Sequence, residues 1–269
     1  MTNRAANPNP AVATTNRAVT PSPVVATRQG SRTLRRLFGS SVGQKIIMAV
    51  TGVILSLFVL GHMLGNLQIF QGQEAIDAYA RFLRVEPALL WAVRFGLLAA
   101  VALHIWAYIV LLRQNQKARP GAGYRVLHYK ESSIASRSMR LTGPLLLAFI
   151  IYHILHMTTG TVHSSFHEGA VYQNLVTAFS SVTVVVIYLL SMAMLALHLW
   201  HGVWSVFQTL GASQPRYLSF GRRLATVFTI VVVLGFSAVP LVILAGVIKS
   251  EETGAPHSGT EVERPARPD

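Results

Sequence analysis

The sequence contains no cysteine among its 269 residues. Without cysteine the chain can form no disulfide, and it can hold neither a thiolate-bound zinc ion nor an iron–sulfur cluster. Ten histidines are present. Histidine is therefore the one strong metal ligand that this chain offers in quantity.

Charged residues are also scarce. They make up 12% of the sequence, against 52% hydrophobic residues, whereas soluble domains are usually about one-quarter charged. Residues 169–215 contain no Asp, Glu, Lys or Arg. A transmembrane helix needs about 20 apolar residues, and five stretches are long enough: 46–70, 87–112, 141–161, 176–208 and 224–248. We therefore expect an all-α integral membrane protein, a bundle of five transmembrane helices.

The net charge of +13 is unevenly distributed along the chain. Seventeen of the 23 Lys and Arg residues lie in three segments: before the first stretch, between the second and third, and between the fourth and fifth. These segments contain a single acid, Glu131. Basic residues gather on the cytoplasmic side of membrane proteins. This pattern predicts a cytoplasmic N-terminus and a C-terminus outside, and it argues against nucleic acid as the partner.

The two ends of the chain lack the apolar pattern of the middle. Residues 1–32 are rich in Ala, Thr, Asn, Pro and Arg, and residues 251–269 are rich in Pro, Gly and Glu. Such compositions predict a disordered basic arm and a disordered tail. The arm is not expected to be a signal peptide, because no separate apolar segment follows its basic residues. The transmembrane domain is predicted to span residues 33–250.

Six histidines lie in the first four apolar stretches, where an ionisable side chain is costly and usually functional. Counted along each helix from its cytoplasmic end, His62 and His153 lie about 25 and 20 Å deep. By the same count His104 and His198 lie about 13 and 15 Å deep. Each helix thus offers one histidine at one of two levels. We expect two bis-histidine sites, His62 with His153 and His104 with His198, each suited to haem iron.

The histidine pattern leaves alternatives open. His156 and His201 each follow another histidine by three residues on the same helix face, so depth alone does not separate these neighbours. A zinc or copper site would need three or four ligands at one level, which the two levels disfavour. Intramembrane histidines could also form a relay in a haem-free transporter or proton channel. Such proteins favour broken helices or repeats, and neither is evident.

Three motifs carry a resemblance to a known family. They are "TGVILSLFVLGHMLGN" (51–66), "RSMRLTGPLLLAFIIYHILHM" (137–157) and "LHLWHGVWSVFQTLG" (197–211). In this order, with five spans, the sequence resembles the cytochrome b subunit that anchors succinate:quinone oxidoreductases. The resemblance is to the five-helix, two-haem b558 type found with menaquinone-linked succinate dehydrogenases and fumarate reductases, and it covers roughly residues 40–248.

The resemblance also chooses between neighbouring histidines. In that family the third-helix ligand lies ten residues after the Gly of a Thr-Gly pair, here Gly143, which selects His153. The fourth-helix ligand lies four residues before a Gly, here Gly202, which selects His198.

The resemblance implies two haem b groups. The distal haem would be held by His62 and His153, and the proximal haem by His104 and His198. Haem propionates need cationic or hydrogen-bonding partners near the ends of the bundle. The candidates are Lys45, Arg140 and Arg94.

Partners follow from the same resemblance. A flavoprotein subunit with FAD and an iron–sulfur subunit would dock on the cytoplasmic face of a bacterial cytoplasmic membrane. This chain lacks a Gly-rich dinucleotide fingerprint, a large extramembrane domain and cysteine. It would therefore be the non-flavin subunit of the enzyme complex and would not itself oxidise succinate. A cytochrome b subunit of a hydrogenase or formate dehydrogenase is the alternative among electron carriers.

The implied role is to pass electrons between the iron–sulfur subunit and a membrane quinone through both haems, in a direction that the sequence does not give. The resemblance favours menaquinone as the quinone. Quinone reduction also requires protons. Glu86, at the outer start of the second span, is the candidate for proton transfer, with Asp77 and Glu74 behind it.

Overall fold

The computed structural model of the protein describes residues 38–117, 134–211 and 214–249. The predicted arm (1–32) and tail (251–269) lie outside these residues, as do the predicted domain limits at 33 and 250. The chain divides into two units, Met1–Gly43 and Gln44–Asp269. Of the first unit only residues 38–43 are described, and there the Gly43 N–H donates to the Ser40 hydroxyl oxygen at 3.0 Å. The bundle belongs to the second unit.

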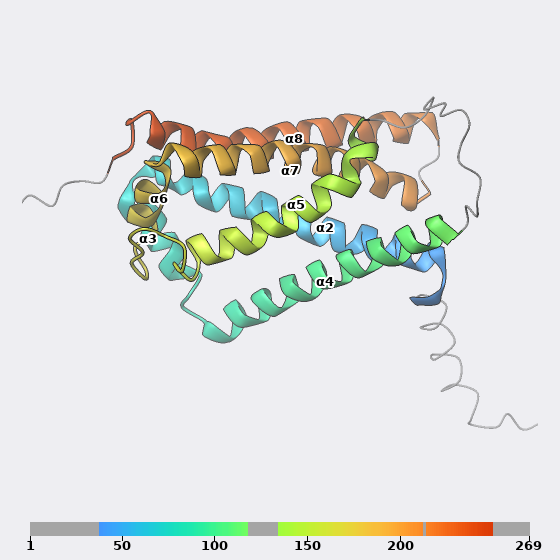
Figure 1. The fold of residues 1–269 in the computed structure, drawn as a ribbon, viewed down its shortest axis with the longest axis horizontal. Helices are drawn as coiled ribbons and strands as arrows, with labels where there is room; N and C mark the ends of the chain where they lie inside the picture. The colour runs from blue at the N-terminus through green and yellow to red at the C-terminus, as the bar shows by residue number, and fades with distance from the viewer. Residues whose placement is uncertain (1–37, 118–133, 212–213, 250–269) are drawn as a thin grey trace, which may run out of the picture. The chain divides into compact units, whose positions relative to one another are not determined.

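The elements in the described residues are all helical (Figure 1). They are α2 (Ser41–Asn66), η1 (Leu67–Gln71), α3 (Gln73–Phe82), α4 (Pro87–Lys117), α5 (Ile134–Met157), α6 (Val171–Phe179), α7 (Val182–Thr209) and α8 (Pro215–Leu244). Among them five segments are long and apolar enough to cross a membrane: α2 with η1, α4, α5, α7 and α8. The predicted all-α protein with five transmembrane helices is confirmed.

Large apolar side chains cover the outside of these helices. On α4, for example, Leu89, Phe95 and Leu98 are all exposed. Contiguous apolar surface of this kind is rare on proteins that face only water. In a bilayer the same side chains face lipid, while the helical backbone satisfies its own hydrogen bonds.

Among the predicted helix limits that differ from the structure, two have a clear local cause. Residues 176–208 were expected as one span, but α6 ends at Phe179 and α7 begins at Val182, after an extended Ser181. Serine is favoured at the residue before a helix, and a hydropathy pattern does not detect that break. Helix α8 begins at Pro215, nine residues before the apolar stretch 224–248. Proline suits the first position of a helix because it needs no N–H partner there.

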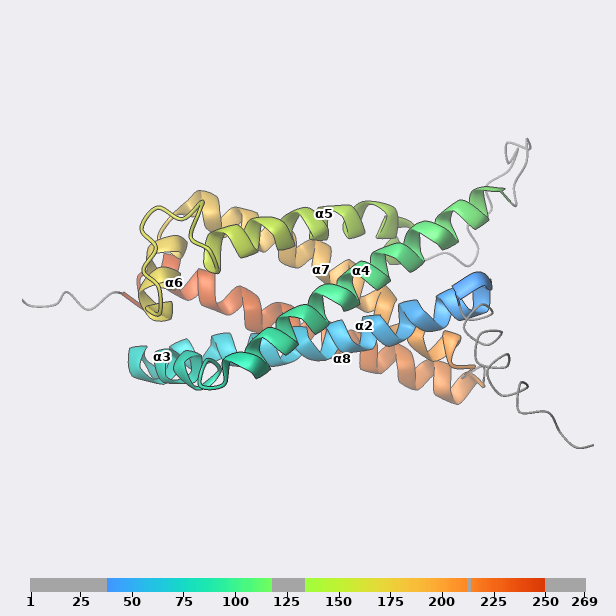
Figure 2. The same cartoon turned by 90° about the horizontal axis from the view of Figure 1, so that it is seen from below.

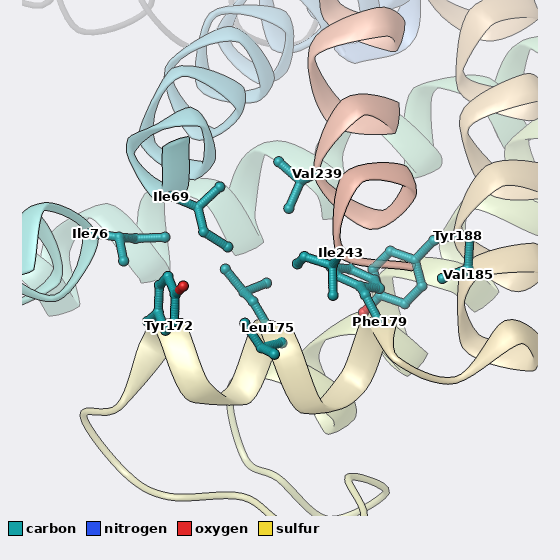
Figure 3. Packing of buried hydrophobic residues seen from close by; sticks show 10 residues of the cluster. Ile69, Ile76, Tyr172, Leu175, Phe179, Val185, Tyr188, Val239 and Ile243 are labelled. Atoms are coloured by element: carbon teal, nitrogen blue, oxygen red, sulfur yellow. The ribbon is translucent and has the colours of Figure 1, made fainter. Parts of the chain in front are cut away.

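One end of the bundle is closed by a cluster of apolar side chains, which we call the end cap (Figure 3). Helix α6 contacts α3, α7 and α8 there. The Asp77 carboxylate on α3 accepts the backbone N–H of Tyr172, in the first turn of α6, at 3.1 Å, and so satisfies one of the free N–H groups at that helix start. The buried side chains of the end cap are Ile69, Ile76, Tyr172, Leu175, Val176, Phe179, Val185, Tyr188, Val239 and Ile243.

Helices α7 and α8 pack side by side, as both views show (Figures 1 and 2). The Trp200 indole N–H donates to the Thr226 hydroxyl oxygen at 3.2 Å. At Gly221 the two helices are so close that an added Cβ would lie 2.8 Å from Cγ of Phe207. Small residues permit such close approach between transmembrane helices. The turn between the two helices uses Gly211 with a φ of 79°, a conformation that favours glycine after a helix end.

We expect Gly221→Ala to destabilise the α7–α8 pair. The new methyl group would meet the base of the Phe207 ring rather than a flexible tip, and overpacking of this kind costs about 1–3 kcal/mol. The measurement is the thermal unfolding midpoint of the protein in detergent.

The matched control is Gly96→Ala on α4, where an added Cβ meets no atom within 4 Å. This variant should be as stable as the wild type or more stable, because alanine favours a helix over glycine by about 1 kcal/mol. Equal midpoints for the two variants would contradict the predicted close contact.

Candidate functional site

Histidines from four helices form two pairs inside the bundle. The ring centroids of His62 on α2 and His153 on α5 lie 5.8 Å apart, with 76° between the ring planes. The ring centroids of His104 on α4 and His198 on α7 lie 6.3 Å apart, with 55° between the planes. We call these the His62 pair and the His104 pair. The structure brings together the same partners that the depth count matched.

The spacing within each pair suits two ligands of one metal ion. A metal–imidazole bond is about 2 Å long, and a ring nitrogen lies about 1 Å from the ring centre. Two imidazoles on opposite sides of one ion therefore have centroids about 6 Å apart, close to both measured values. Two protein ligands leave the remaining positions to a planar macrocycle such as haem.

A closed zinc or copper site is not supported by the described residues. Among them, no group of three or more His, Cys, Asp and Glu side chains could hold a metal ion. The two-ligand arrangement is therefore the one that the histidine geometry favours.

Thr51 fixes the tautomer of His104. The Thr51 hydroxyl donates to the Ile47 carbonyl at 2.7 Å, which uses its one proton. Its oxygen lies 3.1 Å from Nδ1 of His104 and so acts as an acceptor for an Nδ1–H group. The lone pair of His104 then resides on Nε2, the nitrogen that remains free to bind a metal. An added Cβ on Gly52 would lie 3.5 Å from Cε1 of His104, an ordinary contact distance, so the imidazole lies against α2 at this residue.

His198 has a similar neighbour on α5. The Thr142 hydroxyl lies 3.5 Å from Nδ1 of His198, and its weak second contact is the Met139 sulfur at 3.9 Å. Thr142 is completely buried. Both histidines of the His104 pair therefore direct Nδ1 toward a threonine hydroxyl, which orients the rings.

The His62 pair has a more aromatic environment. The His62 ring stacks on Phe58, with centroids 5.5 Å apart and 9° between the planes, and it also contacts Phe236 at 5.7 Å. The Asn66 amide donates to the His62 carbonyl at 2.8 Å and lies 3.4 Å from Nε2 of that ring. His153 directs Nδ1 toward the Tyr188 hydroxyl at 3.2 Å.

The two neighbouring histidines have other surroundings. His156 is buried, with Nδ1 at 3.0 Å from the same Tyr188 hydroxyl. Its ring stacks on Tyr152 with centroids 5.2 Å apart and lies 5.0 Å from the His163 ring. It is His153 whose ring contacts His62, which favours His153 as the partner of His62, and the ligand assignment stays a prediction.

His201 and Trp204 present unpartnered donors beside the His104 pair. Within the described residues, Nδ1 of His201 and Nε1 of Trp204 are buried without a hydrogen-bond partner. Both lie on α7 within six residues of His198, and the Arg222 guanidinium lies 4.9 Å from the centre of the Trp204 ring. Buried donors of this kind are costly unless an acceptor satisfies them. A carboxylate near this end of α7 would do so.

Other predicted site residues lie apart from the histidine pairs. Lys45, Arg140 and Glu86 are exposed, and the exposed Arg94 has its guanidinium 5.0 Å from the Trp91 ring centre. No contact in the described part of the chain joins these four to either pair. Their assigned roles stay predictions.

The two acids placed behind Glu86 have structural partners. Asp77 is buried and accepts a hydrogen bond at the start of α6. Glu74 is exposed and pairs with Arg81 on its own helix. Neither arrangement leaves a free carboxylate directed toward the His62 pair.

The hydroxyl partners were missed at the sequence level, although a signal for two of them exists. Helices α2 and α5 each carry a Thr-Gly pair whose threonine precedes a histidine by eleven residues, because 62 − 51 and 153 − 142 both equal 11. Eleven residues are about three helical turns. The threonine and the histidine therefore lie on the same face, and each helix serves both pairs. Tyr188 has no comparable signal.

Comparison with known proteins gives one match. Residues 115–238 match the family model described as succinate dehydrogenase/fumarate reductase transmembrane subunit. This match supports the predicted resemblance to a membrane-anchor subunit. It includes all of α5, α6 and α7, most of α8, and the two ligand candidates His153 and His198. No curated protein and no solved structure matches the chain.

Residues 115–238 are thus similar to the transmembrane subunit of succinate dehydrogenase or fumarate reductase, and the five apolar helices indicate a multi-pass membrane protein. The predicted resemblance is confirmed at this level. The two-haem type stays a prediction.

Proposed function

We propose that this subunit passes electrons between an iron–sulfur subunit and a membrane quinone through two haem b groups. The observation that carries the proposal is the two histidine pairs, with centroid separations of 5.8 and 6.3 Å. Haem supplies the one-electron iron couple that such a path requires. His62 and His153 would hold the distal haem, and His104 and His198 the proximal haem.

The surroundings of the pairs also fit haem. Added Cβ atoms on Gly143 and Gly202, which are both half-buried, would meet nothing within 4 Å, so space is left beside residues close to His198. The unpartnered donors of His201 and Trp204 suit the propionates of a proximal haem better than Lys45 and Arg140, which are both exposed. Carboxylates accept such hydrogen bonds strongly.

The proposed complex places a flavoprotein with FAD and an iron–sulfur subunit on the cytoplasmic face of a bacterial cytoplasmic membrane. In this orientation the α7–α8 turn is cytoplasmic and the end cap is outside. The candidate docking surfaces are the basic segments 114–140 and 210–223, which fall partly outside the described residues. Menaquinone is the proposed quinone, and it would bind on the side of the distal haem.

The first test is a dithionite-reduced minus oxidised visible spectrum of the purified complex, with haem quantified for each copy of this chain. We expect two b-type haems. His198→Ala should remove one, because it deletes a ligand of the proximal haem, and His201→Ala should leave both in place.

Two haems after His198→Ala together with one haem after His201→Ala would reassign the ligand. Wild-type complex with no haem would refute the proposal. It would favour the haem-free transporter or channel alternative. Co-purification of a hydrogenase or a molybdenum enzyme would instead favour the other cytochrome b family.

We expect Thr51→Val to weaken the proximal haem. The substitution keeps the shape of the side chain but removes the oxygen that accepts from Nδ1 of His104. Loss of such a hydrogen bond to a metal ligand typically costs about 10–100-fold in affinity. The measurement is the proximal haem content after extended dialysis.

Ser56→Ala is the matched control on the same helix, since the Ser56 hydroxyl donates to the Gly52 carbonyl. Its haem content should equal that of the wild type. Equal haem loss from both variants would show that Thr51 acts through helix packing alone.

We expect Glu86→Gln to slow quinone reduction while both haems remain. Glu86 is exposed just before Pro87 begins α4, at the proposed outer end, and a positioned proton donor contributes about a hundredfold or more to a rate. The assay is quinone turnover by the complex, with Glu74→Gln as the control carboxylate. Unchanged turnover with both haems present would remove Glu86 from the mechanism.

A further inference from the structure

The Tyr188 hydroxyl lies between two imidazoles of α5. Its oxygen is 3.2 Å from Nδ1 of His153 and 3.0 Å from Nδ1 of His156. Tyr188 is six residues into α7, and only 7% of its surface is exposed. Neither the histidine spacing nor the family match assigns it a role.

The tyrosine ring is held in place by the end cap (Figure 3). Phe179 of α6 packs edge-to-face on it, with centroids 4.9 Å apart and 84° between the planes. Phe149 of α5 packs in the same way at 5.1 Å and 88°. Such edge-to-face pairs have a preferred geometry. The position of the hydroxyl between the two imidazoles is therefore fixed by contacts on two sides.

A tyrosine hydroxyl has one proton and can donate it to only one imidazole. If the proton goes to His153, that ring accepts at Nδ1 and must carry its own proton on Nε2, which blocks metal binding there. If the proton goes to His156, at the shorter distance, the Tyr188 oxygen can accept from an Nδ1–H group of His153. Only the second arrangement leaves Nε2 of His153 free as a ligand.

We propose that Tyr188 and His156 are positioning residues that together set the tautomer of His153 and, through it, the reduction potential of the distal haem. The inference rests on the proposed function, because it concerns the haem that His153 would hold. His156 takes the tyrosine proton, and the tyrosine oxygen takes the hydrogen bond from His153. At the other pair the Thr51 hydroxyl donates its proton to the Ile47 carbonyl. In both pairs the hydroxyl proton thus goes to a separate acceptor, and the hydroxyl oxygen accepts from the histidine.

The first experiment is a redox titration of the two haems in the wild-type complex and in Tyr188→Phe. A hydrogen bond accepted from Nδ1–H increases the basicity of a ligating imidazole and so stabilises the oxidised iron. Its removal should raise the midpoint potential of the distal haem and leave that of the proximal haem unchanged.

Tyr152→Phe is the matched control. Tyr152 lies on α5 and stacks on His156 with its ring, so this variant removes a nearby hydroxyl while the Tyr188 bridge stays in place. Both midpoint potentials should equal those of the wild type.

The second experiment is a double-mutant cycle with His156→Phe, measured by distal haem content and potential. In the single variant the Tyr188 proton has lost its acceptor and can be donated to His153, so distal haem should be lost. In Tyr188→Phe/His156→Phe that competing donor is absent. The distal haem should return, with the raised potential of Tyr188→Phe. Retention of the proximal haem reports that each variant has folded.

Several outcomes would overturn the inference. Equal loss of distal haem in the single and double variants would show that His156 acts by packing, since coupling between interacting residues is non-additive. Wild-type complex with two haems whose potentials are insensitive to Tyr188→Phe would reject the inference while the proposed function stands. Wild-type complex without haem would reject both.

Discussion

A ring nitrogen buried inside a membrane bundle needs a hydrogen-bond partner or a metal ion, because water is not there to satisfy it. Most features of the proposed site follow from this constraint. His104, His153 and His198 each direct Nδ1 toward a hydroxyl oxygen. The hydroxyl proton of Thr51 is already committed to a backbone carbonyl, so the nitrogen facing it must be a donor. The second nitrogen of the ring then needs its own partner, and under the proposed function iron between two such rings would supply it for both.

The same constraint explains why α2 and α5 are organised alike. On each helix a Thr-Gly pair is separated by three turns from a histidine on the same face. The threonine of each helix contacts the His104 pair, and the histidine of each helix belongs to the His62 pair. Each helix therefore contributes a candidate ligand at one level and an orienting hydroxyl at the other. A rotation of either helix would disturb both pairs at once.

The sequence was sufficient to predict the features that repeat along one helix. The five spans follow from hydropathy, and the two histidine levels follow from counting residues along each helix. The break between α6 and α7 could not be predicted this way, because Ser180 and Ser181 interrupt the apolar pattern too little. The contacts from Thr51 to His104 and from Tyr188 to His153 join residues 53 and 35 positions apart. Whether such groups meet depends on how the helices pack, which a one-dimensional pattern does not contain.

The packing also differs between the two ends of the bundle. At the end cap, α3 and α6 pack against the long helices and hold Tyr188 beside the His62 pair.

Helix α4 is packed more loosely, because only Ala100 and Ala107 are buried on it. One of its contacts with another helix is the one from His104 to Thr51. A helix that buries so little apolar surface gains little from the bundle itself. Under the proposed function, a haem bound by His104 and His198 would join α4 to α7, and binding free energy at that site would add to the stability of the fold.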